Sequence, residues 1–184
     1  MRLGMDIAPH IQSGRMAVRQ LDPAEISPGE FIATIRHAVE KNHARIIIID
    51  SLNGLLNAMA EERQMVLQMH ELCAYLNQQG VATFLVLAQA GILGPQMMPP
   101  VDLSYLADNV LLLRYFEAAG AVRKAVSVVK KRNGAHEQAI RELQLRDGGI
   151  DVSEPLKEFH GILTGVPTFT GRSAELGAGP GEPS

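Results

Sequence analysis

An aspartate at the end of an aliphatic run is the first residue whose position suggests chemistry. Residues 46–49 are four consecutive isoleucines, and Asp50 follows them directly. A carboxylate at the carboxyl end of a buried parallel strand lies at the crevice where such sheets bind ligands. There it can hold Mg²⁺, usually through water, because magnesium retains most of its hydration shell. The alternative is structural: Asp50 caps the following turn by accepting backbone hydrogen bonds from Leu52 or Asn53.

A basic cluster is the second candidate. Residues 130–136 have the sequence KKRNGAH and follow the alternating segment 125–129. A strand there places Lys130 and Arg132 on the same side, and Gly134 permits a close approach, so this pair can grip a phosphate group. A solvated basic turn is the alternative. His136 fits a surface or packing histidine better than a ligand.

Gln89 directly follows the apolar segment 81–88 and is expected at the edge of the same crevice, where it can sense a γ-phosphate; a turn-forming glutamine is the alternative.

The phosphate-binding loop that would complete a nucleotide site with these residues does not occur in this sequence. None of the 17 glycines belongs to a G-x-x-x-x-G-K-[ST] loop, which cradles phosphates with backbone N–H groups and a lysine. We therefore predict that these 184 residues alone are not a competent ATPase.

Composition argues against several other classes. Nucleic-acid binding through Lys130–Arg132 is one hypothesis, but the net charge of −3 and the eight aromatic residues, none of them tryptophan, argue against it. No apolar run approaches the roughly 18–20 residues that span a bilayer. No two of the six histidines have metal-ligand spacing, and no nucleophile-elbow sequence occurs. Cys73 is the only cysteine, so no internal disulfide can form, and we expect a cytoplasmic protein with Cys73 as a small buried hydrophobe.

The elements that must position these residues have an α/β pattern. Ser27, Pro28 and Glu30 predict the start of a helix with a capping box, and apolar spacing continues this helix to residue 42. Segments 45–50 and 81–88 are apolar on both faces, as buried parallel strands are, and a helix over 61–79 separates them. Alternation over 16–20 suggests a further strand. The fold class is therefore α/β, with a central, mostly parallel sheet flanked by helices.

The pattern changes after residue 91. Residues 91–100 are expected to form a mobile loop, and 109–115 with 122–130 an antiparallel hairpin extension. A strand over 139–146 and a turn at 147–149 follow. We expect one domain over residues 1–169 and a disordered Gly/Pro-rich tail over 170–184.

Six short motifs, in this order and spacing, resemble the KaiC-like branch of the RecA superfamily, the group that includes the circadian-clock ATPase. They occupy residues 21–25, 27–31, 49–54, 104–108, 129–136 and 163–167. The resemblance covers nearly the whole chain except the tail, and it implies a RecA-like core, ATP and Mg²⁺ as cofactors, and hexamers with ATP between subunits. Some relatives are also serine/threonine autokinases. The family's phosphate loop and catalytic glutamates are expected before the point where this sequence begins.

The resemblance also implies residue roles. Asp50 would be the Walker B carboxylate, the metal-side catalytic residue, with Ser51 beside it at the nucleotide. Lys130 and Arg132 match the family's K-x-R element, which reaches the γ-phosphate held by the neighbouring subunit. Further residues expected along the same nucleotide are Lys124, Lys131, Gly134, His136 and, near the adenosine end, Asp147. Ser104 aligns with a phosphorylated serine of the clock protein, but Tyr105 replaces the adjacent threonine, which disfavours autophosphorylation.

Two functions follow as hypotheses. The first is the carboxy-terminal portion of a ring-forming, ATP-dependent signalling ATPase that is inactive alone. The second is a non-catalytic module that docks on a complete paralogue through the Lys130/Arg132 face and modulates its activity. We also expect an exposed apolar surface beside the missing first strand, which would make the isolated chain prone to association. Asp50→Asn is expected to leave folding intact.

Overall fold

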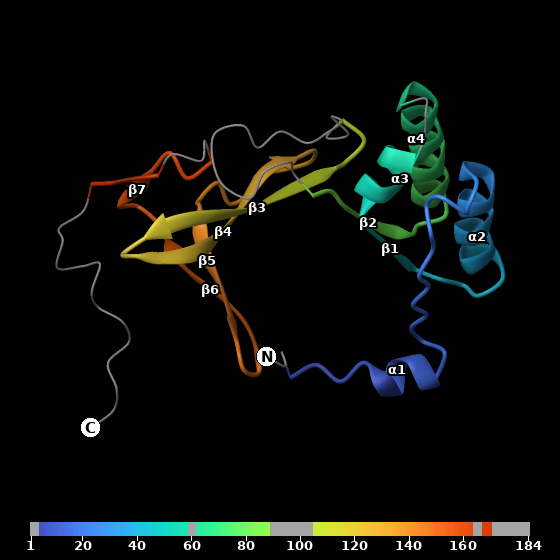
Figure 1. Ribbon diagram of the computed structural model, residues 1–184, viewed down its shortest axis with the longest axis horizontal. Helices are drawn as coiled ribbons and strands as arrows, with labels where there is room; N and C mark the ends of the chain where they lie inside the picture. Colours follow the sequence, from blue (N-terminus) through green and yellow to red (C-terminus); the bar gives the residue numbers. More distant parts are fainter. Residues whose placement is uncertain (1–3, 59–61, 89–104, 164–166, 171–184) are drawn as a thin grey trace. The chain divides into compact units, whose positions relative to one another are not determined.

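The computed structural model describes residues 4–58, 62–88, 105–163 and 167–170 (Figure 1). The predictions for Gln89, Ser104 and the loop 91–100 concern residues outside these ranges, as does the predicted tail 170–184 except for Thr170. The Thr170 N–H donates to the Glu158 carbonyl at 2.9 Å. The described chain forms two compact units. We call residues 14–88 with 105–106 the α/β unit, and residues 4–13 with 107–170 the β unit.

The α/β unit begins with the predicted capped helix. Helix α2 spans Pro28–Glu40, and the Ser27 hydroxyl accepts a hydrogen bond from the Glu30 backbone N–H at 3.3 Å. The Glu30 carboxylate accepts one from the Ser27 N–H at 2.9 Å, which completes the capping box. Both bonds satisfy N–H groups that the first turn of a helix leaves without partners. The capping box therefore confirms the predicted start of this helix.

Two parallel strands form the sheet of this unit. Strand β1 spans Ile46–Asp50 and β2 spans Ala82–Val86, paired so that Asp50 stands opposite Val86. Helix α4, Glu62–Gln78, connects them after the shorter helix α3, Leu52–Ala58. The peptide bond between Asp50 and Ser51, at the end of β1, is cis.

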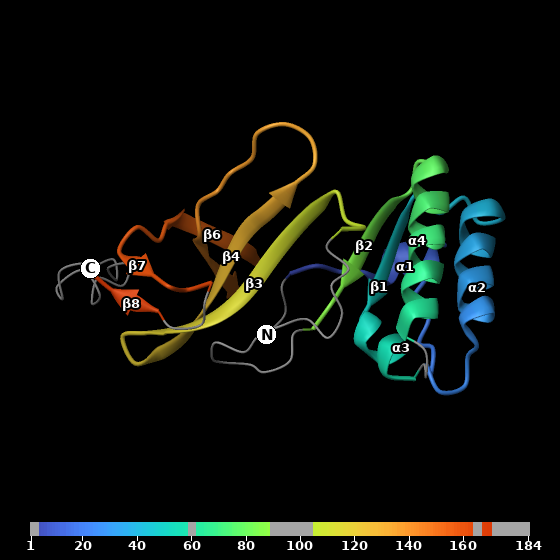
Figure 2. The ribbon, with the colours of Figure 1, turned by 90° about the horizontal axis from the view of Figure 1, so that it is seen from above.

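Among the described residues, helices cover one face of this sheet. Helices α2 and α4 lie on the same side of β1 and β2 (Figure 2), where a single core forms between the helices and the sheet. Its buried members are Phe31, Ile35, Val39, Ile49, Leu52, Leu55, Met69, Leu72, Leu76 and Val81. On the opposite face Ile46, Ile48 and Phe84 are 60%, 63% and 57% exposed. The expectation of a strand buried on both faces was therefore wrong, whereas the expected exposed apolar surface is present.

Two local predictions also need correction. The alternating segment 16–20 forms no strand, because within the described residues it pairs with no other segment, and Val18 is 67% exposed. Helix α3 was not predicted, since its seven residues contain Gly54 and are too short to show a helical period. Cys73 packs against the core as expected but is only partly buried; burial raises the pKa of its thiol.

The β unit is an antiparallel sheet preceded in sequence by the short helix α1, Ala8–Gln12. Strands β3, Asn109–Ala118, and β4, Ala121–Lys131, form the predicted hairpin. Their connection is a two-residue turn in which Ala119 and Gly120 both have positive φ, a conformation that favours glycine. Strands β5, Arg141–Arg146, and β6, Gly149–Pro155, complete the order β3-β4-β5-β6.

A small aromatic core lies against this sheet. Two short strands, β7, Phe159–His160, and β8, Thr168–Phe169, pair next to it. The Phe116 and Phe159 rings meet edge to face with centroids 5.5 Å apart, and Ile162 is fully buried beside them. Edge-to-face rings are a favoured aromatic arrangement. This core lies at the turn end of the β3–β4 hairpin, whose open end carries the basic cluster.

Candidate functional site

Asp50 ends β1 with an exposed side chain, as expected of a residue at the ligand edge of a parallel sheet. Ser51 follows it and is half-buried. Within the described part of the chain, the Asp50 carboxylate accepts no hydrogen bond from Leu52 or Asn53, so the turn-capping alternative finds no support. The carboxylate is thus available to a ligand at the carboxyl end of the strand.

Asn53 has a structural role that the sequence did not reveal. Its side-chain amide donates to the Ala88 carbonyl at 2.7 Å, and its amide oxygen accepts from the Ala88 N–H at 2.7 Å. The side chain thus pairs with the backbone just after β2 as another peptide group would. This clamp joins the beginning of α3, next to Asp50, to the residue immediately before Gln89. The only signal in the sequence was an amide residue three positions after Asp50.

The basic cluster lies at the end of β4 and in the turn after it. Lys130 and Lys131 are the last two residues of the strand, and Lys130 is half-buried. The Lys131 ammonium donates to the Ala135 carbonyl at 3.1 Å and so closes the turn. Gly134, within this turn, has φ of 78°, which a residue with a side chain rarely adopts. The structure therefore brings Lys130, Lys131, Arg132, Gly134 and His136 together in one short segment.

Arg132 is bound to Asp108 across the end of the hairpin. Its guanidinium lies 2.8 Å from the Asp108 carboxylate, and its backbone N–H donates to the Asp108 carbonyl at 2.7 Å. Both side chains are more than half exposed. Asp108 comes directly before β3, so the pair extends the β3–β4 ladder by one position. In the sequence, Asp108 is marked only as the last residue of the motif 104–108.

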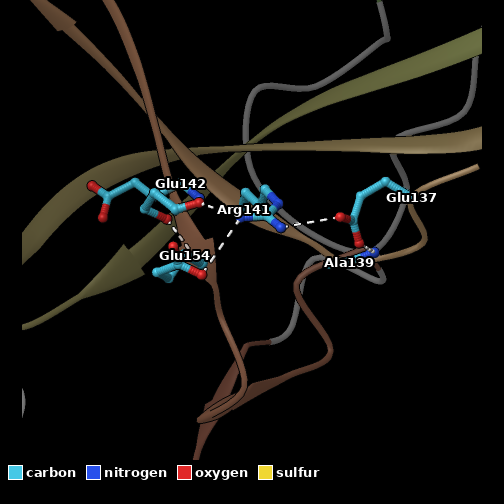
Figure 3. Close-up of polar contacts among 6 residues, drawn as sticks. Glu137, Ala139, Arg141, Glu142 and Glu154 are labelled. Atoms are coloured by element: carbon cyan, nitrogen blue, oxygen red, sulfur yellow. Dashed lines mark hydrogen bonds and ion pairs between the residues drawn. The ribbon is translucent and has the colours of Figure 1, made fainter.

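A network around Arg141 fastens the segment that carries His136. Figure 3 shows Arg141 between Glu137, 3.0 Å away, and Glu154, 3.9 Å away. The Arg141 guanidinium also donates to the Ser153 carbonyl at 2.8 Å. Glu137 accepts from the Ala139 N–H at 3.1 Å, and its bond with Arg141 is the main reason why its pKa is lowered. The loop after β4 is therefore tied to β5 and β6.

Two further predicted residues lie elsewhere in the β unit. Lys124 is in β4 opposite Tyr115, with its ammonium 6.0 Å from the centre of that ring. Asp147 is exposed in the turn between β5 and β6. Because β5 runs antiparallel to β4, this turn lies toward the Ala121 end of β4 and away from Lys130. The structure does not bring Asp147 to the basic cluster.

Comparison with known proteins decides the family. The family model of the KaiC ATPases matches residues 1–157, which is most of the chain. This chain belongs to the KaiC family. The resemblance drawn from the six short motifs is thereby confirmed.

Curated KaiC proteins match over nearly all of this chain. It is 23% identical over 172 residues to the circadian clock protein KaiC3 of Synechocystis, covering 92% of this chain and 34% of that protein. It is 25% identical over 167 residues to the circadian clock oscillator protein KaiC of Synechococcus elongatus, covering 90% and 32%. The chain thus spans about a third of the length of these relatives.

A solved structure shares the fold. The KaiC-like protein of the archaeon Pyrococcus horikoshii superposes with a TM-score of 0.68 and 22% identity, covering 83% of this chain and 66% of that one. The predicted RecA-like α/β class with an antiparallel extension is therefore confirmed. No helix in the described ranges is long and apolar enough to cross a membrane.

The donor groups present suit a magnesium nucleotide better than a bound metal ion alone. No group of three or more His, Cys, Asp or Glu side chains in the described residues could hold a metal ion. Mg²⁺ is commonly held by only one or two carboxylates together with water and substrate phosphates, and the exposed Asp50 fits that role. The lysines and arginine at the end of β4 suit phosphate oxygens. Each unit thus carries groups of a kind that can bind part of a magnesium nucleotide.

Proposed function

We propose that this chain forms part of a ring with ATP bound between neighbouring subunits, as in a KaiC-type ATPase. Each chain contributes one wall to each of two ATP sites. Asp50 acts as the Walker B carboxylate that orients Mg²⁺ on the chain's own nucleotide. Lys130 and Arg132 act in trans on the γ-phosphate of the nucleotide held by the neighbouring subunit. Lys131, Gly134 and His136 line that phosphate side, with Lys124 farther along β4 and Asp147 toward the adenosine. Ser51 and Gln89 belong to the Asp50 wall.

The supporting observation is the exposed carboxylate of Asp50 at the carboxyl end of β1, with no hydrogen bond from Leu52 or Asn53 in the described chain. Bound Mg²⁺ neutralises the charge that develops on the phosphates during transfer. The chain's own part is to orient the hydrated ion through Asp50 and to neutralise phosphate charge through Lys130 and Arg132. Because these 184 residues contain no phosphate loop, they hydrolyse no ATP by themselves.

A fusion tests both walls together. The phosphate-loop half of a complete KaiC is joined in front of this chain, and ATP turnover is measured for this fusion and for three variants of it. We expect turnover in the fusion and its loss in Asp50→Asn and in the double variant Lys130→Ala/Arg132→Ala. Arg146→Ala removes another exposed arginine of the same unit and should leave turnover unchanged.

Mixing the two inactive fusions decides between cis and trans action. In a ring with head-to-tail interfaces, random mixing of equal amounts leaves both walls intact at about a quarter of the interfaces. Turnover of the mixture should therefore recover to about a quarter of the turnover of the unmodified fusion. If both walls served the same nucleotide within one chain, no site would be intact and the mixture would stay inactive, which would contradict the trans assignment.

A second candidate function is docking on a complete paralogue without catalysis. The exposed apolar face formed by Ile46, Ile48 and Phe84 favours it, because parallel sheets are normally covered on both faces. Under this function, adding the unfused chain to a complete paralogue from the same genome changes that protein's ATP turnover. An unchanged rate over a wide range of ratios would exclude modulation by docking. Autokinase activity at Ser104 is not part of either proposal.

A further inference from the structure

Arg132 is engaged by a carboxylate at the place where the proposed function needs it to meet a phosphate. Asp108 and Arg132 are joined through their backbones at 2.7 Å and through their side chains at 2.8 Å. The backbone bond holds the two residues side by side whatever their side chains do. The side-chain contact can therefore open without loss of the strand pairing that places Arg132.

The side-chain contact is of a kind that exchanges easily. The two side chains are 51% and 55% exposed, and exposed ion pairs hold their geometry only weakly. A terminal phosphate offers up to two negative charges and three acceptor oxygens, whereas a carboxylate offers one charge and two oxygens. Lys130 and Lys131 precede Arg132 directly, so this segment brings three cationic side chains to an arriving phosphate.

We propose that Asp108 is a carboxylate latch on Arg132: it binds the guanidinium until a phosphate chain arrives, and the phosphate then takes its place. This inference rests on the proposed function, since the phosphate would be that of ATP on a neighbouring subunit. Asp108 is a positioning residue and touches no substrate. It lowers the affinity of the basic end for phosphate while holding Arg132 in reach.

The Arg146–Asp151 pair provides a matched control in the same unit. Its atoms are 3.1 Å apart and its side chains are 56% and 60% exposed, which closely matches the Asp108–Arg132 pair. Arg146 has no lysine beside it and lies at the end of β5. Removing the Asp151 charge changes the total charge of the chain equally, but does so away from the basic cluster.

The experiment titrates the isolated chain with tripolyphosphate at low ionic strength and follows the backbone amide resonances of residues 130–136 by NMR. Asp108→Asn should bind about fivefold more tightly than wild type, because a full charge next to the guanidinium is lost in a weakly screened setting. Asp108→Glu should stay near wild type, and Asp151→Asn should match wild type. Arg132→Ala should bind more weakly than any of them.

Equal or weaker binding by Asp108→Asn would overturn the latch, as would the absence of binding in that variant. A residue needed only for structure would weaken binding when replaced, so the sign of the change separates the two roles. A second measurement needs no variant: in wild type, the Asp108 carboxyl carbon resonance should move together with the Arg132 side-chain resonance. A stationary Asp108 signal during Arg132 binding would also refute the proposal. Only the isolated chain is used, so a failure of trans action in mixed rings would be recognised separately.

Discussion

The two units hold their candidate residues in opposite ways. In the α/β unit, Asp50 is the last residue of a strand packed on a continuous apolar core, and the Asn53 side chain ties the next element to the Ala88 backbone. In the β unit, the basic end of β4 is held by exposed ion pairs and a lysine-closed turn. Core burial is worth several kcal/mol per large side chain, whereas an exposed ion pair is worth roughly 0–1 kcal/mol. The position of Asp50 therefore depends on core packing, whereas the side chains at the basic end of β4 depend on weak, exposed contacts.

The largest expected effect comes from the core under Asp50. Leu76 is fully buried between α4 and the sheet, so Leu76→Ala should lower the free energy of unfolding of the α/β unit by about 2–5 kcal/mol. Urea unfolding followed by helical circular dichroism measures it. A loss below about 1 kcal/mol would mean that this core is loosely packed and that the contrast between the units is smaller than stated.

The second largest effect is expected from removing the Asn53–Ala88 clamp. Asn53→Ala removes two hydrogen bonds, which together should lower the free energy of unfolding by roughly 1–3 kcal/mol. Hydrogen exchange of the Ala88 amide should also become faster, because that amide loses its acceptor. Asp50→Asn is the matched control, three residues away in sequence, and should change neither quantity. An equal loss in Asp50→Asn would assign Asp50 a structural role after all.

The features that sequence reasoning anticipated depend on near neighbours. Ser27 and Glu30 face each other across the first turn of one helix, so their spacing alone predicts the capping box. The β3–β4 hairpin follows from two apolar strands on either side of a glycine-containing turn. The RecA-like fold followed from the order of six motifs. Each of these signals is readable without knowing what packs against it.

The features that it missed depend on partners far along the chain or on cover by other segments. Asn53 meets Ala88 across 35 positions, and nothing in the local pattern of either residue marks the pair. Arg132 meets Asp108 only once the hairpin has formed. Segment 16–20 alternates as a strand does, but alternation predicts a strand only where another edge pairs with it. Likewise, the exposure of Ile46 and Ile48 depends on what covers the sheet.

The smallest expected effect is a pH-dependent loosening of the loop after β4, in the β unit only. The Arg141 hydrogen bond lowers the pKa of Glu137 from its ordinary 4.5, so the folded state favours the ionised carboxylate. The stabilisation is complete above the ordinary pKa and is lost as the pH falls through the lower folded value. In that window the Ala139 amide, which donates to Glu137, should show a changed chemical shift and faster exchange. Glu137→Gln should abolish this pH dependence.

The clamp in the other unit supplies the internal reference for this titration. Asn53 and the Ala88 backbone contain no ionisable group, so the Ala88 amide should keep its protection while the Ala139 amide changes. If both amides changed together, acid would be opening the chain globally rather than loosening the loop after β4. If neither changed, the Glu137–Arg141 contact would contribute nothing to holding His136, and the Lys131–Ala135 bond and the Asp108–Arg132 pair would carry that role instead.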